Sequence, residues 1–306
     1  MRRNGDGHVY RALTVAGSDS GGGAGIQADL KTFAAFDVYG MSVIAGLTAQ
    51  NTIGVQGIEP VSPEFVLLQL RSVFNDLRPD AIKTGMLGNS DVIDTVARYL
   101  QEQTFTNIVV DPVMVAKGGE SLLEQEAVHA LCEKLLPLAL VVTPNIPEAE
   151  VLCGYKIDSF AKCQKAARDI SRMGPKYVVI KGGHASESWK QENTTQMSEQ
   201  LATDLVYSDE LETYFSSQRI DSLKTHGTGC TFSSAVAANI ASGASVLDAI
   251  ATAKAFIHSA IDSAKEFDIG SGHGPTDHSV SVEAVHGVIP GKHFVWTGKQ
   301  FEEYEL

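Results

Sequence analysis

The sequence is poor in cysteine, with four residues in 306: Cys132, Cys153, Cys163 and Cys230. No two of them form a CxxC pair, so neither a zinc site nor a disulfide framework is indicated, and a reducing compartment is expected. No apolar run is long enough to cross a bilayer, and residues 1–8 contain no apolar signal core. We therefore expect a cytoplasmic protein with no membrane partner.

Positive charge is also scarce. The chain has 24 Lys and Arg residues against 37 Asp and Glu residues, a formal net charge of −13. Such a surface repels nucleic acid, which is therefore not an expected partner. An anionic ligand would have to be held by a local group of lysines, backbone amides or a metal ion. The composition, 43% hydrophobic and 20% charged, is typical of a folded globular protein.

Strand and helix patterns alternate along most of the chain. Short apolar runs predict strands at 11–17, 41–48, 81–84, 107–110, 138–143, 177–180 and 204–207. Helical periodicity predicts helices at 26–36, 63–75, 90–103, 124–136, 146–153, 161–173, 228–242 and 246–267, with Ser90 as a cap. Apolar strands separated by helices indicate a mostly parallel sheet covered on both faces, so we expect a doubly wound α/β fold.

The domain boundaries follow from where this alternation stops. Residues 1–10 are expected to be an N-terminal extension and 11–280 a single domain. The polar stretch 186–203 predicts an exposed loop insertion, and 211–220 alternates like an edge strand. The role and packing of the tail at 281–306 are not predicted by its pattern.

The segment Gly227-Thr228-Gly229-Cys230 opens a predicted helix. Free backbone amides and the positive end of the helix dipole can hold a phosphoryl oxyanion there. A tight turn capped by Thr228 before a packing helix explains these residues equally well. The helix terminus would favour a thiolate at Cys230, although cysteine is also a common small apolar residue at such a position.

Three oxygen-bearing residues are candidates for binding Mg²⁺. Asn145 and Glu148 lie three residues apart on a first helical turn, and Asp111 follows a predicted strand. Asn145 and Glu148 also fit a helix capping box, and one pair can serve both purposes. Lys181 follows another strand beside glycines and could reach a polyphosphate, or it could be an ordinary strand-end lysine.

The remaining motifs carry less information. Asp19 and Gln50 follow predicted strands and Lys83 lies near the end of another, where ligands of such sheets collect. The glycine loop at 21–25 lacks the GxGxxG register of a dinucleotide site. Four histidines have no metal-ligand spacing and are expected to be surface or turn residues: His184, His226, His273 and His278.

Seven motifs taken together closely resemble the hydroxymethylpyrimidine and phosphomethylpyrimidine kinases of thiamine biosynthesis. They occur in the same order and spacing over about 13–278, and the combination is far more specific than any one of them. The motifs are GSDSGGGAGIQAD (17–29), TAQNT (48–52), KTGM (83–86), DPVM (111–114), TPNIPE (143–148), KGGH (181–184) and HGTGC (226–230).

The resemblance implies a ribokinase-like fold and a Mg·ATP donor. It implies phosphorylation of 4-amino-5-hydroxymethyl-2-methylpyrimidine and then of its monophosphate, and it implies a homodimer. Asp29, Gln50 and Gly17 would bind the pyrimidine, and the Gln50 amide offers a donor and an acceptor for the aminopyrimidine edge. The other implied roles are Mg²⁺ binding by Asp111, Asn145 and Glu148, ATP phosphate binding by Lys181, Thr228 and Gly229, and catalysis by Cys230, Lys181, Gly227 and Gly229.

Two alternatives remain open. A pyridoxal kinase of the same fold shares the phosphate machinery, but Gln50 argues against it. A non-catalytic sensor of pyrimidine or ATP is disfavoured by the intact set of candidate residues. Most ribokinase relatives carry Asp as the base where this chain has Cys230, and phosphoryl transfer tolerates a weaker base because it depends mainly on positioning and charge.

Overall fold

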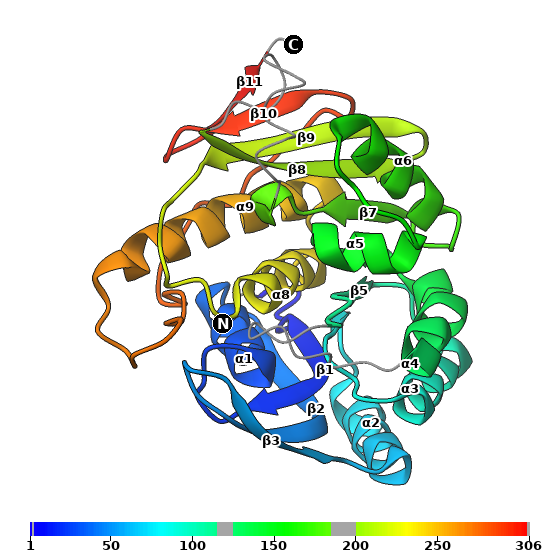
Figure 1. The fold of residues 1–306 in the computed structure, drawn as a ribbon. Coiled ribbons are helices and arrows are strands. Elements are labelled where there is room, and N and C mark those ends of the chain that lie inside the picture. Colours follow the sequence, from blue (N-terminus) through cyan, green and yellow to red (C-terminus); the bar gives the residue numbers. More distant parts are fainter. Residues whose placement is uncertain (2, 115–124, 185–199, 305–306) are drawn as a thin grey trace.

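A computed structural model of the chain describes all residues except 2, 115–124, 185–199 and 305–306. The described residues form one sheet of eleven strands in the order β11-β10-β9-β8-β7-β6-β5-β4-β1-β2-β3 (Figure 1). The strands are β1 (Arg11–Asp19), β2 (Tyr39–Gln50), β3 (Val55–Pro60), β4 (Ala81–Thr84), β5 (Ile108–Val110), β6 (Val141–Val142), β7 (Tyr177–Ile180), β8 (Leu201–Ser208), β9 (Leu211–Gln218), β10 (His293–Trp296) and β11 (Phe301–Tyr304).

The centre of the sheet is parallel. Strands β2, β1, β4, β5, β6 and β7 run in one direction, whereas β3, β8 and β11 each pair antiparallel with a neighbour. Because parallel neighbours need a crossover connection, a helix follows most of the central strands. This arrangement confirms the predicted doubly wound, mostly parallel α/β fold.

Helices cover both faces of the sheet (Figure 1). One core contains side chains of α2, α3, α4, α5 and α6, and the other contains side chains of α1, α8 and α9. The helices are α1 (Gly25–Ala35), α2 (Pro63–Leu77), α3 (Ser90–Glu102), α4 (Gln125–Ala130), α5 (Ile146–Cys153), α6 (Phe160–Ser171), α8 (Thr228–Ala241) and α9 (Val246–Ser263).

Alternate residues of the central strands face opposite cores. In β4, Ala81 belongs to the core that contains α8 and α9 while Ile82 belongs to the other core, and in β5 Val109 and Val110 divide in the same way. Successive strand side chains point to opposite faces, so a strand with a helix layer on each side must be apolar throughout. This is why the strands have continuous apolar sequences.

Several predicted boundaries differ from the structure. Helix α5 is as predicted, but Asn89 rather than Ser90 caps α3, because the Asn89 side chain accepts a hydrogen bond from Val92 N. The predicted helix at 124–136 is an α-helical turn followed by a π turn and a short 3₁₀ segment that ends at Leu138. Strand β3 was not predicted because its residues are mostly exposed and lack apolar alternation.

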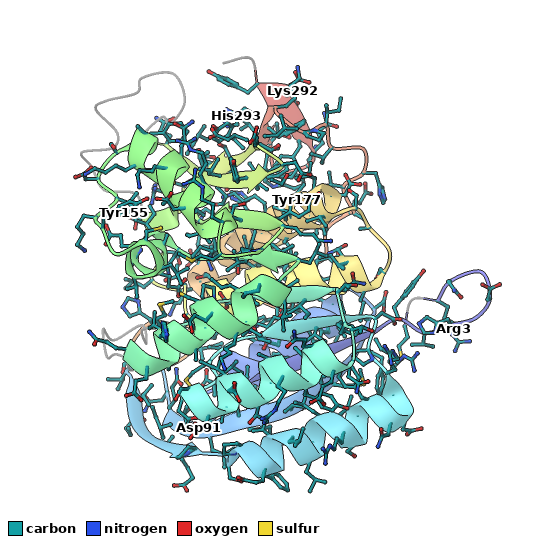
Figure 2. The ribbon with its side chains drawn as sticks, turned by 90° about the vertical axis from the view of Figure 1, so that its right-hand side faces the viewer. Arg3, Asp91, Tyr155, Tyr177, Lys292 and His293 are labelled. Atoms are coloured by element: carbon teal, nitrogen blue, oxygen red, sulfur yellow. The ribbon has the colours of Figure 1, made fainter. Side chains whose placement is uncertain are left out.

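The prediction of an edge strand at 211–220 is wrong. Strand β9 lies between β8 and β10, and β10 comes from the tail whose packing the sequence did not predict. Figure 2 shows Lys292 and His293 at the β10 end of the molecule, far from Asp91 of α3. The tail therefore extends the sheet.

The predicted loop at 186–203 is described only in part. Residues 186–199 lie outside the described residues, whereas 201–203 begin β8 and include the buried Thr203. Within the described residues, no helix is long and apolar enough to cross a membrane.

Candidate active site

A cavity of about 820 Å³ lies beyond the carboxyl ends of the central strands. This is where ligands bind in open α/β sheets, because the strands end there and the loops to the helices begin. Of the predicted site residues, all but Asp29 line it: Gly17, Gln50, Asp111, Asn145, Glu148, Lys181, Gly227, Thr228, Gly229 and Cys230. Asp19, Lys83 and His226 also contribute to its wall.

The N-terminus of α8 opens onto this cavity. Gly227 precedes the helix with φ +80°, a left-handed conformation that favours glycine. A Cβ at this position would lie 1.8 Å from the carbonyl oxygen of Gly23, so the glycine loop and the start of α8 are packed backbone to backbone. The first-turn amides of α8 are thereby presented to the cavity wall, as an anion site requires.

Lys181 and Asp111 lie beside the same helix terminus. A Cβ on Gly229 would be 3.4 Å from Lys181 Nζ and 3.7 Å from Asp111 Oδ2, so Gly229 lies directly beside both side chains. Lys181 Nζ is 3.4 Å from Asp111 Oδ1, and Ser233 of α8 donates a hydrogen bond to Asp111 Oδ2 at 3.2 Å. Burial opposes the charge of Lys181, but Asp111 and Glu148 outweigh burial and raise its pKa. The lysine is therefore a cation at neutral pH.

Asn145 and Glu148 form the capping box of α5. Asn145 Oδ1 accepts from Glu148 N at 2.9 Å, and Glu148 Oε2 accepts from Asn145 N at 2.8 Å. Burial, together with the negative charge of Asp111, raises the pKa of Glu148 to about 7 although Lys181 opposes the shift. The buried carboxylates of Asp111 and Glu148 share the single positive charge of Lys181, so one negative charge is left unbalanced when both are ionised.

This set has the chemistry that a magnesium ion requires. Mg²⁺ prefers oxygen ligands, keeps several of its waters and binds through one or two carboxylates together with phosphate oxygens. Asp111 and Glu148 supply such carboxylates at the cavity wall, and the charge of the ion would relieve the repulsion that raises the Glu148 pKa. The residues therefore fit the ion.

Cys230 differs from the expectation of a thiolate. Burial raises the pKa of its thiol to about 12, because the charge of Lys83 does not offset burial and the negative charges of Asp29 and Asp111. Any effect of the helix terminus is outweighed by this environment, so the thiol is neutral before substrate binds.

Asp29 lies beneath the cavity rather than in its wall. Its side chain is fully buried in α1, where it accepts hydrogen bonds from Thr14, Lys83 and Ser234 at 2.6 to 3.0 Å. Ser234 is one helical turn after Cys230. The Asp29–Lys83 ion pair thus anchors the face of α8 that carries the thiol.

His226, which was expected to be a surface or turn residue, is buried. It lies with Asp19 in the cavity wall, where His226 Nε2 is 2.9 Å from Asp19 Oδ2. His278 is also buried and contacts Thr231, while His273 is exposed as predicted. Nothing local in the sequence showed that residues 19 and 226 meet, and only the position of Asp19 after a strand pointed to it.

A further part of the wall comes from β8, β9 and α9. It includes the apolar side chains of Ile257 and Ile261 and a buried ion pair between Lys254 and Asp204, 2.9 Å apart. Asp204 Oδ1 accepts from Gly182 N, so this pair also fixes the backbone next to Lys181.

Comparisons with known proteins show the family of the chain. A family model described as phosphomethylpyrimidine kinase matches residues 19–277. The hydroxymethylpyrimidine/phosphomethylpyrimidine kinase of Bacillus subtilis (strain 168) is 48% identical over 270 residues, covering 88% of this chain and 95% of that protein.

Two solved structures are similar along most of the chain. An ADP complex of Bacillus subtilis pyridoxal kinase has a TM-score of 0.77 and 40% identity, covering 89% of this chain and 98% of that one. Phosphomethylpyrimidine kinase from Clostridium difficile 630 has a TM-score of 0.70 and 38% identity, covering 82% and 99%. The chain therefore belongs to the phosphomethylpyrimidine kinase family, a group of phosphotransferases with a ribokinase-like fold.

Proposed function

We propose that this protein transfers the γ-phosphoryl group of ATP to 4-amino-5-hydroxymethyl-2-methylpyrimidine, and then a second phosphoryl group to the monophosphate. The observation that carries the proposal is that one cavity contains both a phosphate corner and an amide suited to an aminopyrimidine. The phosphate corner consists of Lys181, Asp111 and the start of α8, and the amide belongs to Gln50.

The phosphate corner acts mainly by positioning and by neutralising charge. The amides of Gly227 to Cys230 receive the equatorial oxygens of the transferred group, and the Lys181 ammonium balances their charge. Mg²⁺, held by Asp111 and Glu148 with Asn145 beside them, would neutralise phosphate oxygens when bound.

Cys230 is proposed to position the substrate hydroxyl rather than to remove its proton first. A thiol with a pKa of about 12 holds its own proton at neutral pH, so it is not available to accept the hydroxyl proton, which passes instead to an oxygen of the transferred phosphoryl group. Cys230→Ser should therefore retain most of the turnover that Cys230→Ala loses. Near-normal turnover of Cys230→Ala would remove Cys230 from the mechanism.

The nucleotide is proposed to lie along the wall formed by β8, β9 and α9. Apolar side chains of α9 suit the faces of an adenine ring, and this wall continues to Gly182 and Lys181 at the phosphate corner. Binding of a non-hydrolysable ATP analogue, measured by calorimetry, should weaken at least about tenfold in Ile257→Asp.

The experiment that tests the function is mass analysis of products after incubation with Mg·ATP and the hydroxymethylpyrimidine. Formation of the monophosphate and then the diphosphate is expected. The second candidate is a pyridoxal kinase, favoured by the structural similarity to the Bacillus subtilis pyridoxal kinase. Efficient phosphorylation of pyridoxal, with neither pyrimidine accepted, would replace the first proposal by the second.

A homodimer is proposed through the β3 end of the sheet. Exposed apolar side chains lie there on β2, β3, the turn between them and α2: Leu47, Ile53, Ile58, Phe65 and Leu68. An edge strand beside apolar surface is usually covered in the native assembly. Light scattering should give twice the chain mass, and Leu68→Glu should reduce it to one chain.

A further inference from the structure

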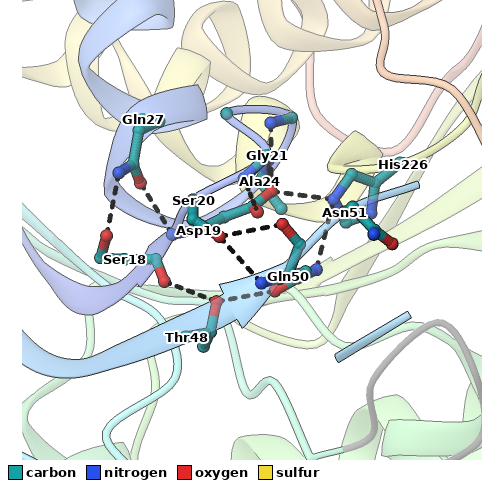
Figure 3. Close-up of polar contacts among 12 residues, drawn as sticks. Ser18, Asp19, Ser20, Gly21, Ala24, Gln27, Thr48, Gln50, Asn51 and His226 are labelled. Atoms are coloured by element: carbon teal, nitrogen blue, oxygen red, sulfur yellow. Dashed lines mark hydrogen bonds and ion pairs between the residues drawn. The ribbon is translucent and has the colours of Figure 1, made fainter. Parts of the chain in front are cut away.

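The Asp19 carboxylate holds the glycine loop and His226 together. It accepts hydrogen bonds from the backbone amides of Gly21, Gly23 and Ala24 at 2.8 to 3.1 Å, and its Oδ2 atom lies 2.9 Å from His226 Nε2 (Figure 3). Burial would favour the neutral acid, but the His226 contact and the backbone amides outweigh it and lower the pKa of Asp19. The carboxylate is therefore ionised and can only accept hydrogen bonds.

This contact determines which nitrogen of His226 carries hydrogen. An acceptor-only carboxylate at 2.9 Å requires a donor opposite it, so His226 Nε2 must carry a hydrogen atom. The conclusion holds whether the imidazole is neutral or charged. His226 therefore presents an N–H group, and not a lone pair, at this point of the wall.

The Gln50 amide meets that N–H group. Its Nε2 atom is 3.4 Å from His226 Nε2, which places a donor against a donor. At the other side, the single Thr48 hydroxyl hydrogen faces two acceptors, Ser18 O at 2.9 Å and Gln50 Oε1 at 3.1 Å (Figure 3). Turning the amide by 180° relieves both conflicts. Oε1 then lies beside the His226 N–H, which donates mainly to Asp19 Oδ2 at 2.9 Å and is shared with Oε1 at the longer distance of 3.4 Å. Nε2 then donates to Thr48 Oγ1 while Thr48 donates to Ser18 O.

We propose that His226, held by Asp19, and Thr48 are positioning residues that lock the Gln50 amide with Oε1 on the His226 side and Nε2 on the Thr48 side. The backbone of Gln50 is fixed as well, since Ser20 Oγ accepts from Gln50 N and donates to Gln50 O at 2.8 and 2.9 Å. The inference rests on the proposed function and deepens it, because it states how the substrate is oriented.

The locked amide admits one orientation of the aminopyrimidine. Its oxygen accepts from the 4-amino group on the His226 side, and its nitrogen donates to ring atom N3 on the Thr48 side. The 5-hydroxymethyl group is the ring neighbour of the amino group, so it is directed toward His226. The chain continues from His226 directly into Gly227–Cys230, so the reacting hydroxyl is brought to the anion site.

The first test determines by NMR which nitrogen of His226 carries hydrogen. Long-range ¹H–¹⁵N spectra of imidazole-labelled protein should show hydrogen on Nε2 of His226 in the enzyme without substrate. A neutral ring with a bare Nε2 atom would overturn the proposal. This measurement needs no substrate, so it decides the inference even if the hydroxymethylpyrimidine is not phosphorylated and the proposed function fails.

The second test determines the orientation of the Gln50 amide from the ratio of kcat/KM for two substrates. The 4-oxo analogue of the hydroxymethylpyrimidine carries an acceptor at C4 and hydrogen on N3, the reverse of the 4-amino compound. The wild-type protein should prefer the amino compound in kcat/KM by at least about 100-fold, because the reversed edge leaves both amide atoms unpaired. Thr48→Val and His226→Met should each lower this ratio at least about tenfold, since each frees one side of the amide.

Two variants serve as controls. Thr48→Ser keeps the hydroxyl and should keep the ratio within about twofold of wild type. His8→Met removes a histidine that pairs with Asp80 in the same way, 2.9 Å apart, outside the cavity wall, and should also keep the ratio. If Thr48→Val and His226→Met lose activity equally on both compounds, leaving the ratio unchanged, the two residues have only a structural role and the proposal is overturned.

Discussion

Glu148→Gln should be more stable than wild type in metal-free buffer at alkaline pH. The same substitution should impair kinase activity. Burial and Asp111 raise the pKa of Glu148 from 4.5 to about 7. Each pKa unit corresponds to about 1.4 kcal/mol, so ionising this carboxyl in the folded protein costs about 3 kcal/mol. Glutamine keeps the capping box, because its side-chain oxygen can accept from Asn145 N, and it carries no charge.

The sign of the pH dependence follows from the raised pKa. The stability that wild type owes to a neutral Glu148 is fully present below pH 4.5, the pKa of this carboxyl in the unfolded chain, and is lost as pH rises through about 7, its pKa in the folded protein. At pH 8 in EDTA the free energy of unfolding of Glu148→Gln should therefore be about 3 kcal/mol higher than that of wild type. Its Tm should be higher by roughly 6 °C for a chain of this size. At pH 5 the difference should fall to less than about 1 kcal/mol.

Denaturant unfolding at both pH values, with calorimetry for Tm, measures this difference. Glu150→Gln is the matched control, since Glu150 accepts from Lys156 Nζ at 2.7 Å and from Ile157 N at 2.8 Å. Burial opposes ionisation of Glu150, but these bonds outweigh it and lower the pKa, so this variant should lose stability at pH 8. Added Mg²⁺ should stabilise wild type more than Glu148→Gln. A variant no more stable than wild type at pH 8 in EDTA would refute the reasoning.

Three further substitutions test the framework around the site. Gly227→Ala should lower kcat about 100-fold, because its Cβ would meet the Gly23 carbonyl oxygen at 1.8 Å and displace the anion site. Binding of a non-hydrolysable ATP analogue, measured by calorimetry, should weaken less than kcat falls. Lys83→Met should cost about 3–5 kcal/mol in urea unfolding by leaving the Asp29 carboxylate unpaired, and adding Asp29→Asn should recover most of it; no recovery would contradict the ion-pair argument. Lys254→Met should cost a similar amount through Asp204, and a loss below about 1 kcal/mol would show that the buried pair contributes little.

The sequence was sufficient to predict the fold class and most of the residues that form the proposed phosphate corner. Continuous apolar strands separated by helices indicate a covered parallel sheet, because such strands are stable only between two helix layers. Glycines before a helix and a lysine after a strand are local patterns whose chemistry does not depend on distant residues. These predictions concern Gly227, Gly229 and Lys181, and the structure brings these residues to one cavity.

Only the tertiary structure decided properties that depend on residues far apart in the chain. The protonation of Cys230 depends on burial and on Asp29, Lys83 and Asp111, so its position at a helix terminus was not enough to choose between a thiolate and a neutral thiol. Strand β9 became internal because β10, more than seventy residues later, pairs with it. The Asp19–His226 contact spans 207 positions, and no local pattern can report it, because a hydrogen bond depends on distance in space and not on separation along the chain.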